Sequence, residues 1–314
     1  MIIIYKTNVK TGILETKERI SKGCLISLVK PTSDEISSIT ERLNISESFI
    51  TDFLHKKGLP RVDIDENITT FLIDVPIVMG NIHNLDIEST SLGILKISND
   101  YLITVCDREL EILTTMFENT KGDFSTLKES RFIIDLLYRD VRLYQKYIDM
   151  IGDKIEKSED RMLKATKNED LVGFLTLEKS LVYISKAINA NALVFDKIIG
   201  GLIIPLYEED QDLLMDAIME NNQAKSSSSL YRDILNRMTT TVATIISNNL
   251  NRIMKFLAGI TIVLYIPTIV SSFLGMNVPL GNFEKNPFAF LFLIVLALAL
   301  SLTVAYILKK KDLL

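Results

Sequence analysis

Two long runs without charge near the C-terminus constrain this chain more than any other feature. The first, FLAGITIVLYIPTIVSSFLGM, covers residues 256–276, and no charged residue follows it before Glu284. The second, NPFAFLFLIVLALALSLTVAYIL, covers residues 286–308 and is followed at once by three lysines. A helix needs about 20 apolar residues to cross the hydrocarbon core of a bilayer. We therefore predict two membrane-spanning helices, at 256–276 and 288–308.

The charges that flank the two spans predict their topology. Residues 277–287 are too few to form a domain, so the spans form a hairpin with both ends on one side of the membrane. Arg252 and Lys255 precede the first span, and the C-terminal segment 309–314 begins with three lysines. Because positive charge is enriched on the cytosolic side, we expect a multi-pass protein of the plasma membrane with both termini in the cytosol and the loop outside.

The net charge of −5 conceals two parts of different composition. Residues 256–314 carry four basic and two acidic residues, a net +2, so residues 1–255 carry 31 basic and 38 acidic residues, a net −7. A net-acidic body without a basic stripe argues against a nucleic-acid partner, because such proteins neutralise phosphates with Lys and Arg. We expect the lipid bilayer and divalent cations as partners instead.

The scarcity of cysteine and histidine excludes other classes. Cys24 and Cys106 are too few for a disulfide framework and form no CxxC motif. Two histidines make a histidine-based metal cluster a poor interpretation. The start, MIIIYKTNVK, has neither a basic n-region nor a cleavage site, so it is not a signal peptide. No nucleophile–base arrangement occurs, which argues against an enzyme.

Residues 1–120 are predicted to form a small α/β domain. Helices are expected at 33–43 and 46–54, with Ser33 and Ser46 as candidate N-caps. A hairpin is expected at Asn99–Asp100. Six segments of strand length are rich in β-branched and aromatic residues, namely 2–5, 25–29, 61–65, 70–75, 92–97 and 101–106.

The rest of the body is predicted to be helical. Apolar residues recur at spacings of three and four through residues 121–205, with a polar turn at 164–170, which predicts two long antiparallel helices. A stalk helix, 206–255, continues without a stop signal into the first span. About sixty residues of helix would rise roughly 90 Å, so we expect this helix to pack on the paired helices or on copies of itself. The fold class is thus an α+β domain with a long helical stalk and a two-helix transmembrane hairpin.

One face of the stalk helix and first span is small or polar, whereas the rest of the span is Ile, Leu, Val and Phe. Small residues let membrane helices approach closely, so this face could be a tight interface. It could also be the wall of a water-filled pore, because it offers more hydrogen-bonding groups than close packing requires. The face comprises Thr240, Thr244, Ser247, Asn251, Met254, Ala258, Thr261, Tyr265, Thr268, Ser272 and Gly275.

A Gly-Met-Asn triplet closes the first span. Gly275, Met276 and Asn277 follow IPTIVSSFL and precede a short outward loop and a second span that ends in basic residues. In this position, behind a large acidic body, the triplet resembles that of the CorA family of magnesium channels. The resemblance extends over essentially the whole chain.

The resemblance implies a funnel-shaped homopentamer whose first spans line a central pore, with the second spans outside. Thr268 is similar to a pore-facing Thr of the family and Asn251 to an Asn near the cytosolic mouth. Met254 and Leu257 match a hydrophobic constriction that would gate by excluding water. Some relatives have Gly and Asp where Ser272 and Thr240 stand here. The pore-lining set is therefore Asn251, Met254, Leu257, Ala258, Thr261, Tyr265, Thr268 and Ser272.

The triplet is implied to be the selectivity filter, with Asn277 forming a ring at the outer mouth. Mg²⁺ sheds its water reluctantly, and neutral amide oxygens can accept hydrogen bonds from that water without the strong grip of a carboxylate ring. Gly275 is expected to let the helix end and the backbone approach closely, and Met276 to pack and fix the turn.

The resemblance also implies regulation by two carboxylates. Asp52, in SESFITDFLH, and Asp216, in DLLMDAIMEN, align with a pair that binds Mg²⁺ across a subunit boundary and holds the funnel closed. Without the resemblance, each would be interpreted as a solvated helix residue. Mg²⁺ is thus expected as transported and as regulatory ion.

These features predict a channel for Mg²⁺, with Co²⁺ or Ni²⁺ as further substrates, driven by the electrochemical gradient and gated by cytosolic Mg²⁺. One alternative is a zinc transporter of the same superfamily, although such relatives tend to alter the middle residue of the triplet and Met276 is retained. Another alternative is a membrane-anchored sensor or scaffold whose helices oligomerise without conducting.

Overall fold

The structure is a computed structural model of the full 314-residue chain. It describes residues 1–54, 58–80, 82–98, 100–118, 125–162, 168–200, 203–276 and 288–311. The chain divides into an N-terminal unit, Met1–Met238, and a C-terminal unit, Thr239–Leu314. The boundary falls within one long helix, α6 (Glu208–Leu274), and each unit is described separately.

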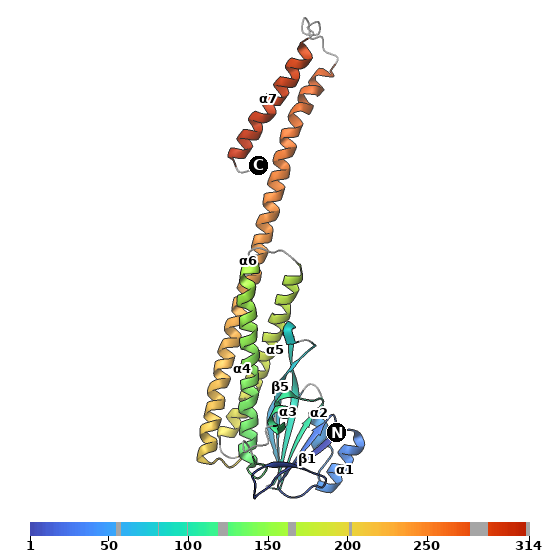
Figure 1. The fold of residues 1–314 in the computed structure, drawn as a ribbon, viewed down its shortest axis with the longest axis vertical. Coiled ribbons are helices and arrows are strands. Elements are labelled where there is room, and N and C mark those ends of the chain that lie inside the picture. Colours follow the sequence, from blue (N-terminus) through green and yellow to red (C-terminus); the bar gives the residue numbers. More distant parts are fainter. Residues whose placement is uncertain are drawn as a thin grey trace. The chain divides into compact units, whose positions relative to one another are not determined.

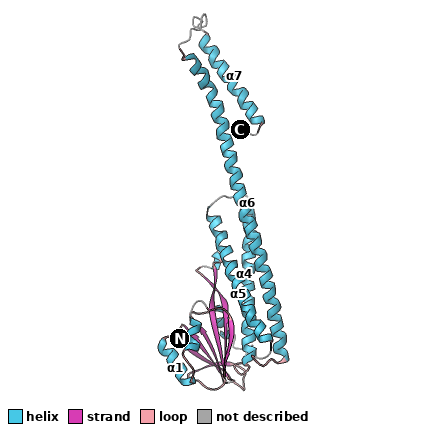
Figure 2. Cartoon of the chain, turned by 180° about the vertical axis from the view of Figure 1, so that it is seen from behind, coloured by secondary structure: helices cyan, strands magenta, loops and turns pink. Residues whose placement is uncertain are grey.

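A seven-stranded sheet forms the centre of the N-terminal unit (Figure 2). Its order is β2-β1-β3-β7-β6-β5-β4. The pair β3–β7 is parallel and the other pairs are antiparallel. The strands are β1 (Ile2–Thr7), β2 (Leu14–Lys17), β3 (Cys24–Val29), β4 (Arg61–Asp65), β5 (Ile68–Val78), β6 (Ile87–Ile97) and β7 (Tyr101–Cys106).

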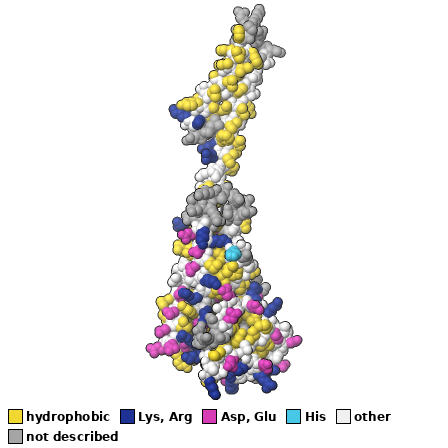
Figure 3. All heavy atoms as spheres, in the orientation of Figure 1, with side chains coloured by type: hydrophobic (Ala, Val, Ile, Leu, Met, Phe, Trp, Pro, Cys, Tyr) yellow, Lys and Arg dark blue, Asp and Glu magenta, His cyan; other side chains and the backbone are white. Residues whose placement is uncertain are grey.

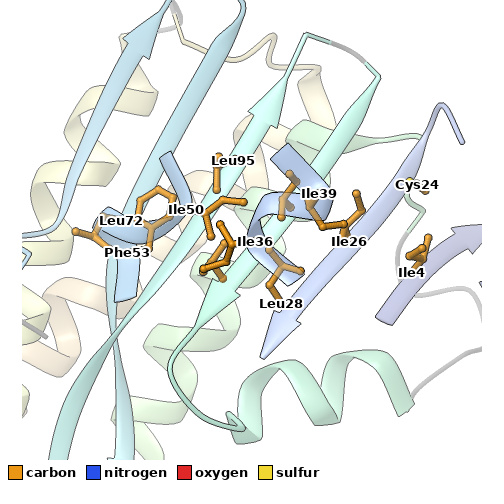
Figure 4. Close-up of a cluster of buried hydrophobic side chains, with 12 residues drawn as sticks. Ile4, Cys24, Ile26, Leu28, Ile36, Ile39, Ile50, Phe53, Leu72 and Leu95 are labelled. Atoms are coloured by element: carbon orange, nitrogen blue, oxygen red, sulfur yellow. The ribbon is translucent and has the colours of Figure 1, made fainter. Parts of the chain in front are cut away.

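Two short helices, α1 (Ser33–Leu43) and α2 (Ser48–Leu54), cover one face of this sheet. Their apolar side chains interlock with side chains of the strands in a single buried cluster (Figure 4). Phe53 of α2 lies directly over Gly93 of β6, where an added Cβ would overlap the aromatic ring. The glycine thus lets α2 approach the sheet closely. The labelled members of the cluster are Ile4, Cys24, Ile26, Leu28, Ile36, Ile39, Ile50, Phe53, Leu72 and Leu95.

The other face of the sheet is covered by helices α4 (Glu129–Met162) and α5 (Asn168–Ile199), and α3 (Glu111–Glu118) packs against α4 (Figure 1). Burial on both faces explains why β5 is buried over most of its length instead of alternating. A 3₁₀ turn, η1 (Ile82–Asn84), connects β5 to β6.

The first part of α6 contacts α4 and α5, and among the described residues it has no extensive contact with the sheet. Arg131 of α4 bonds Asp210 (3.3 Å), and Arg142 bonds Glu220 (3.0 Å). The ring of Tyr231 lies against Gly152 of α4, where a Cβ would overlap it. From α6, the buried hydroxyl of Ser228 donates to the carbonyl of Leu181 on α5 (3.4 Å). Helices α4 and α5 therefore lie between the sheet and α6.

A polar cluster is buried where α4 and α5 meet the edge of β5. Strand β4 begins at Arg61, opposite Leu72, so the outer edge of β5 beyond Leu72 pairs with no strand among the described residues. At Asp74, the side-chain amide of Asn191 takes the place of the missing neighbouring strand. It accepts a hydrogen bond from the Asp74 N–H (2.9 Å) and donates one to the Asp74 carbonyl (2.8 Å). The same carbonyl accepts from the Tyr144 hydroxyl (3.0 Å), and Asn191 also donates to Asp140 Oδ2 (2.9 Å).

The C-terminal unit is a hairpin of the later part of α6 and of α7 (Ala289–Lys310), which lie antiparallel in both views (Figures 1 and 2). Both helices contain segments long and apolar enough to cross a membrane. The less exposed residues of α6 here follow spacings of three and four, at Gly259, Val263, Ile266 and Val270. On α7, Ala297 and Ser301 are each 8% exposed. These residues form the contact between the two helices.

Several local expectations need correction. Ser33 is not an N-cap, because Thr32 caps α1 and forms a capping box with Glu35. The second helix begins at Ser48 instead of 46, and the Ser46 hydroxyl accepts from the Ser48 N–H (3.3 Å). Strand β2 and helix α3 were not expected, and β5 and β6 have 11 residues each. The β6–β7 hairpin is present, although Asn99 lies outside the described residues.

Candidate functional site

The polar face predicted from the sequence is fully displayed on α6. All eight predicted pore-lining residues, Asn251, Met254, Leu257, Ala258, Thr261, Tyr265, Thr268 and Ser272, are exposed in the single chain. The exposure of Tyr265 is 60%, close to the 65% of Leu264 and the 68% of Phe273 on the same helix. We refer to these eight residues as the polar stripe.

The polar stripe does not form the contact between the two spans. At about 100° per residue, the contact residues Gly259, Val263, Ile266 and Val270 lie roughly opposite Ala258, Thr261, Tyr265, Thr268 and Ser272 around α6. The small residue that brings α7 close is Gly259, which does not belong to the stripe. Tight packing within one chain is therefore not the role of the stripe, and only another molecule can cover it.

The threonine hydroxyls of this face have a common arrangement. Thr261 donates to the carbonyl of Leu257 (2.8 Å), and Thr268 donates to that of Leu264 (3.2 Å). Thr244, nearer the N-terminal unit, donates to Thr240 in the same way (3.0 Å). A hydroxyl has one proton to donate and two lone pairs to accept with. With the proton used on the helix backbone, each threonine presents acceptors, which suit the water molecules of a hydrated cation.

The apolar end of the stripe consists of Met254 and Leu257, which are 59% and 53% exposed. On α6, Met254 lies about one turn after Asn251, and Leu257 lies about one turn after Met254. Lys255 and Phe256 stand between Met254 and Leu257 in the sequence. A ring of such side chains from several chains would be narrow and apolar, which is the composition of a gate that closes by excluding water.

The Gly-Met-Asn triplet is only partly within the described residues. Helix α6 ends at Leu274, and the Gly275 N–H bonds the carbonyls of Ser271 (3.1 Å) and Ser272 (3.2 Å). A Cβ on Gly275 would make only ordinary contacts and Met276 is 55% exposed, so neither a close backbone approach nor packing of Met276 is present in one chain. Asn277 lies outside the described residues.

Asp52 and Asp216 are both exposed and are not brought together within one chain. Asp52 belongs to α2, on one face of the sheet, and Asp216 to α6, beyond α4 and α5 on the other (Figure 1). No group of three or more His, Cys, Asp or Glu side chains among the described residues could hold a metal ion. One ion could touch both carboxylates only if they came from different chains.

Two features escaped the sequence reasoning. Asp212 is exposed one turn before Asp216, so this face of α6 presents two carboxylates, and their spacing of four residues was the available signal. The buried cluster of Asp74, Asp140 and Asn191 had no signal, because its members come from three elements far apart in the sequence.

Figure 3 shows how differently the two units present charge. Acidic and basic side chains are interspersed over the N-terminal unit, whereas the hairpin is apolar with basic side chains at one end. In the described parts of the C-terminal unit, residues 239–276 and 288–311, there is no Asp, Glu or His.

Comparisons with known proteins agree with this architecture. The cobalt/magnesium transport protein CorA of Methanocaldococcus jannaschii is 26% identical over 269 residues, which cover 84% of this chain and 83% of that protein. The complete structure of the CorA magnesium transporter from the same organism matches with a TM-score of 0.85 at 21% identity, covering 99% of this chain and 98% of that one. The cytoplasmic domain of ZntB from Vibrio parahaemolyticus matches with a TM-score of 0.63 at 12% identity, covering 78% and 98%.

The family assignment rests on the sequence itself. The sequence model of the CorA-like Mg²⁺ transporter proteins matches residues 22–310, which include the sheet, the long helices and both apolar segments. This confirms the resemblance inferred from the triplet and its position, and it identifies a transport protein, not an enzyme. The chain belongs to the CorA-like Mg²⁺ transporter family.

Proposed function

We propose that this protein is a passive channel that carries Mg²⁺, and also Co²⁺ and Ni²⁺, across the plasma membrane into the cytosol. The polar stripe carries the proposal, because it lies opposite α7 and its threonines present hydrogen-bond acceptors. A membrane potential of 100 mV, negative inside, favours entry of a divalent ion by about 4.6 kcal/mol, twice the value for a unit charge. No other energy source is needed.

A pore requires several copies of α6, since one helix cannot enclose a channel. We propose the funnel-shaped homopentamer implied by the family, with the polar stripes facing inward and both termini in the cytosol. The position of α7 on the opposite side of α6 supports this arrangement, because it leaves the stripe free for the axis. Asn277 would then form the outer ring, where its amide oxygens accept hydrogen bonds from the water around Mg²⁺.

For regulation, we propose that Asp52 of one subunit and Asp216 of the next bind cytosolic Mg²⁺ and stabilise the closed pentamer. Both carboxylates are exposed and lie on opposite sides of the same chain, which is the arrangement that a site between subunits requires. Asp212 is placed to contribute a further oxygen ligand.

The test is ion flux into liposomes that contain the purified protein, with Mg²⁺, Co²⁺, Ni²⁺, Zn²⁺ and the monovalent ion Na⁺ offered separately. The parent should admit Mg²⁺, and Asn277→Ala should lose most of its preference for Mg²⁺ over the smaller hydrated monovalent ions. Retained preference in Asn277→Ala would remove Asn277 as the filter. Flux of Zn²⁺ alone would favour the zinc alternative. Absence of flux for every ion would favour a non-conducting scaffold.

The same liposomes test the regulatory site when Mg²⁺ is placed on the cytosolic side. Mg²⁺ there should suppress flux through the parent, and Asp216→Lys should remain active, because an ammonium group replaces a ligand of the ion. Equal suppression of both proteins would exclude Asp216 from regulation without affecting the proposed channel.

A further inference from the structure

Five basic side chains are concentrated at one end of the α6–α7 hairpin, and we call them the basic end. All five are exposed, and none forms an ion pair among the described residues. No carboxylate occurs in residues 239–276 or 288–311. Asp312 follows in the sequence, which leaves an excess of four positive charges per chain. The basic end consists of Arg252, Lys255, Lys309, Lys310 and Lys311.

The two helices bring these charges to the same end of the hairpin. The uncharged part of α6 runs for 19 residues from Phe256 to Leu274, and that of α7 for 20 residues from Ala289 to Leu308. Because the helices are antiparallel (Figures 1 and 2) and their apolar lengths match, the lysines that end α7 and the basic residues that precede the apolar part of α6 belong to the same end of the hairpin. Figure 3 shows basic atoms gathered at this end of the apolar hairpin.

The lysines that end α7 lie away from the polar stripe, whereas Lys255 of α6 lies beside it. At about 100° per residue, Arg252 lies on the side of α6 that α7 covers, and Lys255 lies one turn from the stripe residues Asn251 and Ala258. On α7, Lys310 follows Tyr306 by one turn on the side away from α6, and the Tyr306 side chain is 70% exposed. Exposed tyrosines next to lysines are typical of the boundary between hydrocarbon and headgroups.

We propose that the basic end binds the headgroups of anionic phospholipids in the adjacent leaflet. Clusters of four or more Lys and Arg at the end of a membrane span attract acidic lipids, and the attraction is strongest where no protein carboxylate competes. Here the apolar spans hold the cations at headgroup depth, and the described part of the unit offers them no acidic partner. The occupant is therefore a lipid with net negative charge, such as phosphatidylglycerol.

This inference requires that the two spans lie in a bilayer, but it does not require conduction. Its test can therefore succeed or fail independently of the proposed channel function. It also differs from the general enrichment of positive charge on the cytosolic side, because it assigns a selective lipid ligand to a defined set of side chains.

The experiment uses the full chain reconstituted in liposomes of phosphatidylcholine with the same fraction of phosphatidylglycerol in both leaflets, so that protein orientation does not matter. Spin-labelled phosphatidylglycerol or phosphatidylcholine is added, and the motionally restricted fraction gives the relative affinity for the two headgroups. The parent should prefer phosphatidylglycerol several-fold. A combined Lys309→Gln, Lys310→Gln, Lys311→Gln variant should lose most of this preference, and adding Arg252→Gln and Lys255→Gln should abolish it.

A matched control removes three positive charges from the N-terminal unit by Lys10→Gln, Lys128→Gln and Lys225→Gln, all at exposed positions. It should keep the preference of the parent. High salt should weaken the preference of the parent and leave the fully neutralised variant unchanged, because exposed charges are screened. An equal preference in parent, control and neutralised variants, or a parent that does not distinguish the two lipids, would overturn the proposal.

Discussion

At the scale of single residues, the buried carboxyl of Asp140 is the most unusual group in the N-terminal unit. Its Oδ2 accepts from Asn191, but its buried Oδ1 has no hydrogen-bond partner among the described residues. Burial raises the pKa of Asp140 well above its ordinary value, and the nearby charge of Asp74 raises it further, while the bond from Asn191 lowers it. The uncharged acid is therefore the form that this site favours.

Asp74 makes the same cluster sensitive to pH in an accessible range. Burial raises its pKa from 3.8 to about 6, against the opposing effects of Lys186 and Ser91. The folded state holds the proton of Asp74 more tightly than the unfolded state does. The contribution of Asp74 to the free energy of unfolding is therefore greatest below pH 4 and falls as the pH rises through 6. The stabilisation lost over this pH range is about 3 kcal/mol, because the pKa of Asp74 differs by about two between the folded and unfolded states.

Asp74→Asn should therefore unfold at a temperature that changes less between pH 4.5 and 7.5 than that of the parent, and it should be the more stable protein at pH 7.5. Thermal unfolding of the purified protein measures both effects. Asp153→Asn removes an exposed carboxylate of α4 and should retain the pH dependence of the parent. If Asp74→Asn matched the parent at both pH values, Asp74 would not be the titrating group.

At the scale of elements, α2 depends on a single close approach. Gly93 leaves room for the ring of Phe53, which is only 4% exposed and belongs to the buried cluster under α1 and α2. The position of Asp52, one residue earlier, follows from this contact. The proposed regulatory ligand is thus placed by the packing of a glycine and an aromatic ring.

Gly93→Ala should destabilise the protein by about 1–3 kcal/mol, the cost of overpacking a core, and should displace α2. Hydrogen exchange should then rise in α2 relative to the parent. Gly173→Ala is the control, because nothing lies within 4 Å of a Cβ at that position of α5. It should be neutral or slightly stabilising, since alanine favours a helix by about 1 kcal/mol over glycine. Equal stability of the two variants would contradict the role assigned to Gly93.

Periodicity predicted the long elements well and the short ones poorly. The stalk predicted at 206–255 and the span predicted at 256–276 form one helix, α6 (Glu208–Leu274), because apolar spacing persists over many turns, even through Pro267. Strand β2, with the sequence LETK, has no apolar alternation and forms because it pairs with β1 at the edge of the sheet. Thr32, and not the predicted Ser33, is the N-cap of α1. Both residue types can cap a helix, and the hydrogen bond that the Glu35 carboxylate accepts from the Thr32 N–H distinguishes the two positions.

At the scale of the whole molecule, the polar stripe should be reachable by water once the chains assemble. Thr261→Cys and Thr268→Cys should react with a charged thiol reagent and lose ion flux, whereas Ile262→Cys should not. The native cysteines will not obscure the result, since Cys24 and Cys106 are buried in the sheet. Reaction at position 262 with no reaction at 261 would place the pore on another face of α6.

The candidate site was predictable where it depends on one helix and not where it depends on several chains. Spacing identified every member of the polar stripe except Leu257, which the family resemblance added, and all eight side chains are exposed in the single chain. The roles of Asn277, Asp52 and Asp216 came from the family resemblance, because each needs a neighbouring subunit that spacing cannot describe. Asp140 and Asn191 could not be paired from the sequence, since 51 residues separate them.

The uncovered edge of β5 has a consequence for how the protein behaves when it is made in quantity. Open strand edges recruit other strands and promote aggregation. Here the edge beyond Leu72 is blocked at Asp74 by Asn191 and Tyr144, and two residues later Pro76 has no N–H to offer. These groups protect this edge of the sheet, and we expect variants of Asn191 to form more insoluble material than the parent.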